Sequence, residues 1–203
     1  DEMSNKVTFG LEKVHIAFML TASTWDTPIP IPGAVRFTPS PQGEESTFYA
    51  DNGPYFTVTA NNGYTAELEM ALVPDVVLKD MLGWEIDGNG MLVEIADGAP
   101  KEFALMGQVL GDKKNRRFVY YRCKAARPGK EHTTKGETTE PATDVLNLTI
   151  LPILIDGKNI VKGVMELGAM NAAAYNAFFD AVTLPDAVPS SVDKTGLAAT
   201  IAL

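Results

Sequence analysis

Apolar and polar residues alternate along much of the chain between Gly63 and Ile155, which predicts strands with one buried and one wetter face. In the run YTAELEMAL the apolar residues share one parity, and Glu67 and Glu69 fall together on the other. A period of two places all residues of one parity on the same side of a strand. We therefore expect a half-buried strand here, with both glutamates facing water.

Two β-hairpins are expected in the same region. The first joins EFALMGQVL to RRFVYYRCKAA through the polar turn GDKKN. The second lies in ILIDGKNIVKGV, where Asp156 and Gly157 supply the positive-φ turn of a tight hairpin. One side of the strand after GDKKN is expected to carry Val119, Tyr121, Cys123 and Ala125.

Helical spacing occurs twice. Pro74 opens the first predicted helix, Pro74–Leu82, and Gly83 is suited to end it. The second predicted helix spans Ala172–Val182, with Asn171 as its N-cap. Its aromatic residues follow the spacing of one helix face, so we expect them to pack on a sheet.

Three segments differ from this pattern. Residues 21–34, TASTWDTPIPIPGA, contain prolines that exclude a helix interior or a central strand, so an extended connection is expected. Residues 128–141, PGKEHTTKGETTEP, have no large apolar side chain, and we expect a mobile polar loop. Residues 185–203 turn apolar after a proline-containing linker and are expected to form a C-terminal arm. The remaining chain, residues 1–184, reads as one β domain.

Composition narrows the function further. The chain has 203 residues, 45% hydrophobic and 21% charged, which is typical of an ordered soluble protein. Its net charge of -9 argues against binding to a phosphate backbone, which requires clustered Lys and Arg. We find no apolar run approaching the roughly 18 residues that cross a bilayer, and the amino terminus lacks a signal pattern. Synthesis in the cytoplasm and no membrane partner are expected.

The residue types that carry chemistry do not form a recognisable site. His15 lies in a strand-like run and His132 in the polar loop, so neither a metal pair nor a catalytic dyad is expected. Cys123 has no reactive-cysteine signature and is expected to be a buried apolar residue. We accordingly expect no catalytic residue, no metal and no cofactor, and therefore no enzyme.

The stretch STFYADNGPYF, residues 46–56, is unusual because aromatic residues flank a turn-forming break. Such a cluster is suited to lining a pocket, filling a core or contacting a second subunit. The four aromatic residues are Phe48, Tyr49, Tyr55 and Phe56.

Several segments, taken in order, resemble the major tail protein (tail tube protein) family of siphovirus-type bacteriophages and prophages. They are NKVTFGLEKVHIAFM, TPIPIPGAVRF, GEESTFYADNGPYF, NNGYTAELEMALVPD, FALMGQVLGDKKNRRFVYYRCKAARP and YNAFFDAVTLP. The resemblance implies a β-sandwich or barrel-like fold with one or two flanking helices and extended arms. It also implies a structural protein of the virion tail, assembled in the host cytoplasm, whose hexameric rings stack into a tube.

The same resemblance implies partners and surfaces. The partners are other copies of the chain and tail proteins such as the tape-measure and tail terminator proteins, while DNA passes through without specific binding. The stretch around Phe48, Tyr49, Tyr55 and Phe56 is then expected at the end of a projecting hairpin or loop that contacts a neighbouring subunit. Glu67 and Glu69 are candidates for the lining of an acidic channel.

Two other classes fit a strand-rich chain. A β-sandwich surface or adhesion module would share the strands and arms but should carry a secretion signal. A lipocalin-like carrier would use the aromatic cluster as a pocket for a small apolar ligand. A purified carrier should stay monomeric and gain stability with such a ligand, whereas a tube protein should self-associate.

Overall fold

The computed structural model describes residues 10–43, 45–50, 53–110, 115–128 and 143–186, and for 45–50 and 53–59 it describes the backbone. Its largest unit is an antiparallel sheet with the order β2-β1-β10-β11-β12-β7-β4, in which β3 also pairs with β1 and β15 with β11. The mainly β fold class is confirmed. The strands of this sheet are β1 (Leu11–Thr21), β2 (Thr24–Trp25), β3 (Ile29–Pro30), β4 (Ala34–Pro41), β7 (Tyr64–Met70), β10 (Phe103–Val109), β11 (Arg117–Ala125), β12 (Asp144–Ile150) and β15 (Lys162–Met165).

The sheet is strongly curled. Phe37 on β4 stacks on Phe118 on β11, with ring centroids 5.7 Å apart, although β7 and β12 separate these strands in the sheet order. The interior cluster also contains residues of β1, near the other end of the sheet, so the sheet resembles a barrel that is not fully closed by hydrogen bonds. Three two-stranded ribbons complete the β structure: β5 (Glu45–Ala50) with β6 (Gly53–Thr59), β8 (Glu85–Ile86) with β9 (Leu92–Val93), and β13 (Ile153–Ile155) with β14 (Lys158–Ile160).

Apolar side chains are buried on both sides of the sheet. The interior cluster joins β1, β10, β11, β12 and β7 with the helix α1 (Asp75–Leu82). A second cluster lies on the other side, where β13 and the helical segment near residue 175 cover β10 and β11. Every residue of β10 from Phe103 to Gln108 is consequently buried.

The first helix is confirmed. α1 begins at Asp75, directly after Pro74, and ends at Gly83, whose φ of 71° is left-handed and favours glycine. Its apolar face is buried in the interior cluster, as the i+4 spacing predicts.

The second helix is shorter than predicted. α2 (Ala172–Asn176) gives way to a 3-10 turn, η1 (Ala177–Phe179), so the predicted range Ala172–Val182 is wrong at its end. Arg117 donates a hydrogen bond to the carbonyl of Tyr175, which a continuing α-helix would use to accept the N–H of Phe179. A contact from another strand thus competes with the helix.

Asn171 is not a side-chain N-cap. Its Oδ1 accepts a hydrogen bond from the Gly168 N–H at 2.7 Å, and its Nδ2 donates to the carbonyl of Glu166 at 2.8 Å. The side chain therefore fixes the loop before the helix, and no cap hydrogen bond forms. The prediction placed the right residue type at the right position but assigned its hydrogen bonds wrongly.

Both predicted hairpins are present, but the predicted face of β11 is wrong. β10 pairs with β11, and β13 pairs with β14 through Asp156 (φ 49°) and Gly157 (φ 75°). Phe103 pairs with Cys123 while Leu105 pairs with Tyr120, so β11 accommodates one extra residue as a bulge. The bulge reverses the faces: Val119 and Tyr121 join the outer cluster, whereas Cys123 and Ala125 join the interior.

Other predictions fall wholly or largely outside the described residues. These are the mobile loop at 128–141, of which only residue 128 is described, and most of the arm at 185–203. In the described parts of the chain, no helix combines the length and apolar character needed to span a membrane.

Candidate assembly surfaces

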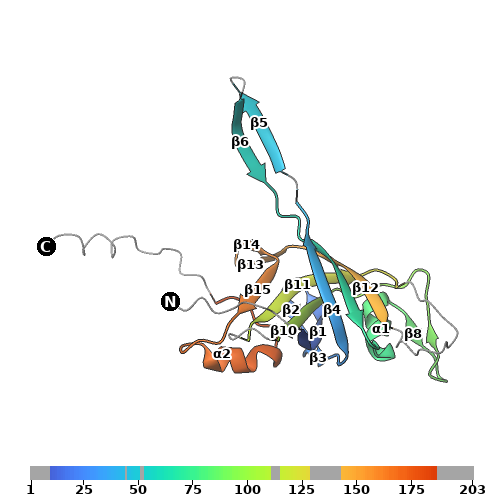
Figure 1. The fold of residues 1–203 in the computed structure, drawn as a ribbon. Coiled ribbons are helices and arrows are strands. Elements are labelled where there is room, and N and C mark those ends of the chain that lie inside the picture. The colour runs from blue at the N-terminus through green and yellow to red at the C-terminus, as the bar shows by residue number, and fades with distance from the viewer. Residues whose placement is uncertain (1–9, 44, 51–52, 111–114, 129–142, 187–203) are drawn as a thin grey trace, which may run out of the picture.

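The β5–β6 hairpin stands clear of the rest of the molecule (Figure 1). Its strands pair only with each other among the described residues, with Phe48 opposite Phe56 and Tyr49 opposite Pro54. The register skips Tyr55, which marks a bulge near the end of the hairpin. Residues 46–50 and 53–56 thus belong to a projecting hairpin, and the expected role of the aromatic residues in subunit contact stays a prediction.

The base of the hairpin is held tightly against the sheet. The N–H of Gln42 donates to the carbonyl of Gly63, and the N–H of Asn62 donates to the carbonyl of Gln42, both at 2.9 Å. Gly63 has φ 95°, and a Cβ there would lie 1.9 Å from the carbonyl oxygen of Ile150. Glycine is required at this position because both the backbone conformation and the approach of β12 exclude a side chain.

Glu67 and Glu69 lie on the outward face of β7, as the alternation predicts, while Ala66, Leu68 and Met70 are buried. The structure adds a cation to this face. The guanidinium of Arg36 on β4 lies 3.7 Å from Oε2 of Glu67 and 3.3 Å from Oε2 of Glu69. The two carboxylates are therefore partly neutralised.

The rest of this face is polar and mostly uncharged. Thr143 donates a hydrogen bond to Oε1 of Glu69 at 2.8 Å, and Gln42 donates to the hydroxyl of Thr65 at 3.0 Å. The cross-strand partners of Glu67 are Thr38 on β4 and Asn147 on β12, both exposed. We call this surface the polar face; its members are Arg36, Thr38, Ser40, Thr65, Glu67, Glu69, Asn147 and Thr149.

Arg36 is the residue of the polar face that sequence reasoning missed. It precedes Glu69 by 33 positions, and only the pairing of β4 with β7 brings them together. A parity argument within GAVRF places Arg36 on the opposite side from Val35 and Phe37, but it gives no cross-strand partner.

Elsewhere on the outer side of the sheet, over β10 and β11, Arg117 fixes the helical segment. Its guanidinium carbon lies 3.9 Å from the ring centroid of Tyr175 and 4.8 Å from that of Phe179. Its Nε donates to Gln108 at 3.0 Å, and Gln108 in turn donates to Glu12 at 2.8 Å. The guanidinium of Arg117 thus contacts both rings and donates to Gln108 on the sheet and to the carbonyl of Tyr175 on the helix. These contacts anchor α2 and η1 on the sheet.

His15 and Cys123 are structural here. The imidazole of His15 stacks on Phe179, with centroids 4.5 Å apart, and its Nδ1 lies 2.8 Å from the carbonyl of Lys13. Burial raises the pKa of the Cys123 thiol well above its ordinary value, which opposes formation of the nucleophilic thiolate. His132 lies outside the described residues.

The pKa values of two buried tyrosines are also raised. Burial raises the pKa of Tyr120 to about 12, with smaller contributions from Tyr64 and Cys123. Burial alone raises the pKa of Tyr121 to about 12. Within the described ranges, no group of three or more His, Cys, Asp or Glu side chains is placed to hold a metal ion.

Comparisons with known proteins give a weak structural likeness. No protein-family model and no curated protein matches the sequence. Among solved structures, the chain is similar to the tube-terminating cap of the anti-feeding prophage, with a TM-score of 0.48, 7% identity, and coverage of 82% of this chain and 97% of that chain. It is also similar to a chain of the anti-feeding prophage baseplate, with a TM-score of 0.44, 9% identity, and coverage of 80% and 97%. Likenesses at this level do not establish a shared role.

Proposed function

We propose that this chain is a structural subunit of a phage-type tail, and specifically of a tube built from stacked rings. The observation that carries the proposal is the β5–β6 hairpin, which projects from the sheet and pairs only with itself in the described structure (Figure 1). An isolated two-stranded hairpin is marginally stable in water. A partner that packs against it supplies the missing contacts, and the aromatic residues at 48, 49, 55 and 56 are suited to that packing.

The resemblance of the ordered sequence segments to siphovirus-type major tail proteins supports a second copy of the chain as this partner. Closed rings also make use of strand edges that a monomer would leave unpaired. β4 is such an edge, because in the described structure it pairs only with β7.

Within such a tube, we assign the polar face to the channel. Its hydroxyl and amide groups are uncharged, and its two carboxylates outnumber the single Arg36. A surface of this kind does not hold the DNA backbone, which is bound by clustered cations. The overall charge of -9 acts in the same direction.

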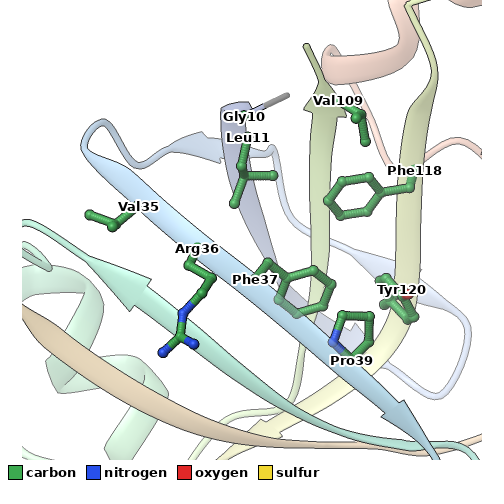
Figure 2. A pocket seen from close by; sticks show the side chains of 9 residues that line it. All are labelled: Gly10, Leu11, Val35, Arg36, Phe37, Pro39, Val109, Phe118 and Tyr120. Carbon is green, nitrogen blue, oxygen red and sulfur yellow. The ribbon is translucent and has the colours of Figure 1, made fainter. Parts of the chain in front are cut away.

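A lipocalin-like carrier is the second candidate, and an adhesion module the third. The aromatic residues at 48, 49, 55 and 56 belong to the strands of a hairpin that projects from the body (Figure 1), which argues against the interior pocket that the carrier hypothesis requires. A carrier would have to use another site, such as the groove of about 400 Å³ that Phe37, Phe118 and Tyr120 line (Figure 2). An adhesion module would bind a cell surface instead of its own copies.

The deciding experiment is assembly of the purified full chain. We expect sedimentation velocity to show concentration-dependent association, and negative-stain electron microscopy to show rings or tubes. Replacing Phe48, Tyr49, Tyr55 and Phe56 by Ser should abolish stacking while leaving the circular dichroism spectrum and the melting temperature of the body almost unchanged.

A matched control removes exposed apolar side chains elsewhere. Met91 and Leu154 are 61% and 63% exposed, so replacing both by Ser tests whether any loss of surface apolarity prevents assembly. A chain that stays monomeric at every concentration and is stabilised by an apolar ligand would instead identify a carrier.

A further inference from the structure

A groove with an aromatic floor opens between β4 and the strands β1, β10 and β11. Figure 2 shows the rings of Phe37, Phe118 and Tyr120 gathered on one side of β4, with the guanidinium of Arg36 on the other. Phe37 and Phe118 stack nearly parallel, and Tyr120 meets Phe37 edge-on at 5.4 Å. Among the described residues β4 pairs only with β7, so no strand lies beside β4 at the groove. We call this hollow the aromatic groove.

The edge of β4 beside the aromatic groove is unsuited to a continuous strand ladder. Pro39 and Pro41 have no N–H to donate. The register with β7 also shifts between Ala34 and Arg36, which leaves Val35 as an extra residue. We therefore expect a partner to fill the groove with side chains instead of adding a regular strand.

The β5–β6 hairpin carries side chains of the required kind. Four aromatic residues, at positions 48, 49, 55 and 56, belong to its two strands. An aromatic side chain buries about 150 to 250 Å², so the four together supply about 600 to 1,000 Å². A stable protein contact buries about 800 Å² on each partner. The aromatic residues of one hairpin thus supply the area that such a contact needs.

The hairpin of a chain points away from its own groove. β4 ends at Pro41 and β5 begins at Glu45, so the hairpin continues beyond the far end of β4 and projects from the body (Figure 1). Backbone hydrogen bonds of Gln42 with Gly63 and Asn62 hold its base. The direction of the hairpin is therefore fixed, and the hairpin that fits the groove is that of another copy.

We propose that the aromatic groove of one chain receives the β5–β6 hairpin of a neighbouring copy. Groove and hairpin are different surfaces of the same chain, so the contact is head-to-tail and passes from copy to copy into a ring or a filament. The proposal rests on the proposed function and specifies which two surfaces meet. In this contact the β4 edge acts through the groove beside it, and every chain supplies one hairpin and one groove.

Photo-crosslinking of the full chain tests the contact directly. Val35 lines the groove and is 52% exposed, so Val35→p-benzoylphenylalanine places a photoreactive group at the groove without altering the core. Irradiation of the assembled protein should give covalent dimers in which position 35 is joined to residues 46–56 of the second chain, identified by mass spectrometry. Val76 is 64% exposed on α1, and Val76→p-benzoylphenylalanine should give at least about tenfold less of this dimer. Crosslinks from position 35 to other segments only, or none, overturn the proposal.

A mixing experiment separates the two halves of the contact. The first chain carries the photoreactive group at position 35 and Ser at positions 48, 49, 55 and 56, so it keeps the groove and lacks the aromatic hairpin. The second chain keeps the hairpin and carries Val35→Asp with Val109→Asp, which place two carboxylates at its own groove. The first chain alone should give no dimer, and adding the second should restore it. A second chain whose hairpin also carries the four Ser substitutions should restore nothing. No dimer from the first mixture, or equal dimer from both mixtures, shows that hairpin and groove do not meet.

Sedimentation velocity separates failure of this proposal from failure of the proposed function. Val35→Asp with Val109→Asp should weaken self-association at least about tenfold, because a docked hairpin would bury unpaired carboxylates. Leu72→Asp with Val76→Asp, at sites that are 67% and 64% exposed, should leave association unchanged. If the unaltered chain and the groove variant associate equally well, this proposal alone is wrong, and an unaltered chain that stays monomeric overturns both. Circular dichroism checks the fold of the groove variant, and the crosslinking result from position 35 decides the matter if that variant does not fold.

Discussion

Arg36 and Glu69 face each other across the β4–β7 pair, with Nε of the guanidinium 3.3 Å from Oε2 of the carboxylate. The same guanidinium lies 3.7 Å from Glu67. Exposed pairs of this kind contribute about 0 to 1 kcal/mol to stability, so their main effect is on surface potential. One cation between two carboxylates leaves the polar face weakly negative, and this bears directly on the proposed channel.

Reversing both carboxylates tests the lining. Glu67→Lys with Glu69→Lys would place two ammonium groups beside Arg36 and convert the face into a cationic patch. We expect the fold to persist, because the face is exposed, and the assembled tubes to retain DNA at low salt and release it as the salt concentration rises. Retention is measured by co-sedimentation of tubes with labelled DNA over a salt series, and reduced infectivity of phage built from these tubes is expected.

Glu94→Lys is the matched reversal for that experiment. Glu94 pairs with Arg127 at 2.9 Å on an exposed part of the surface outside the polar face. The Glu94→Lys variant should leave DNA retention unchanged. Tubes of the double variant that form normally, ignore DNA and support infection would place Glu67 and Glu69 on the outer wall.

Arg117 is expected to be the main anchor of the helical segment. Arg117→Ala removes the hydrogen bonds to Gln108 and to the carbonyl of Tyr175, together with both ring contacts. We expect a loss of about 2 to 4 kcal/mol in the free energy of unfolding, measured with urea. Amide exchange across 172–179 should rise more than in β10. Arg127→Ala, at an exposed pair, should cost under about 1 kcal/mol, and equal losses for the two variants would argue against an anchoring role.

Gly63→Ala should be strongly destabilising. An alanine Cβ would be strained by the left-handed backbone and would lie 1.9 Å from the carbonyl oxygen of Ile150. We therefore expect a loss of about 2 to 4 kcal/mol in the free energy of unfolding. Gly157→Ala separates these causes, because Gly157 also has positive φ but meets nothing within 4 Å. It should cost about 1 kcal/mol. Similar urea midpoints for the two variants would show that β12 yields at this contact.

Alkaline pH should destabilise the protein. In the unfolded chain tyrosine ionises near pH 10, whereas Tyr120 and Tyr121 in the folded protein hold their protons to about 12. The unfolded state therefore binds fewer protons, and the free energy of unfolding falls as pH rises from about 10 to 12. Cys123, whose pKa is also raised by burial, starts the decline nearer pH 9.

Urea midpoints across this pH range measure the effect. Tyr121→Phe should reduce the alkaline loss because it removes one of the shifted groups, at the cost of the hydrogen bond to the carbonyl of Thr183. Cys123 in the native protein should resist thiol reagents until urea unfolds it. Stability that is flat up to about pH 12, or rapid native labelling of Cys123, would contradict the buried environments assigned to these groups.

Local pattern was sufficient for several parts of the molecule. The alternation in YTAELEMAL placed Glu67 and Glu69 on the exposed side of β7, because parity within one strand depends only on backbone geometry. The Asp156-Gly157 pair predicted a tight turn, and both residues have positive φ in the structure. α1 begins after Pro74, which lacks the N–H that a helix start leaves unpaired, and ends at Gly83, which adopts the left-handed conformation easily.

Tertiary structure decided everything that depends on contacts between distant segments. The bulge in β11 reversed the faces of Cys123 and Ala125, since the position of an extra residue depends on the pairing with β10. Arg117 shortened the second helix by binding the carbonyl of Tyr175, 58 residues away along the chain. Arg36 came to lie beside Glu67 and Glu69 only because β4 pairs with β7. The sequence by itself determined which residues a strand exposes, and the fold determined which charges and rings meet there, because cross-strand neighbours are set by sheet order and register.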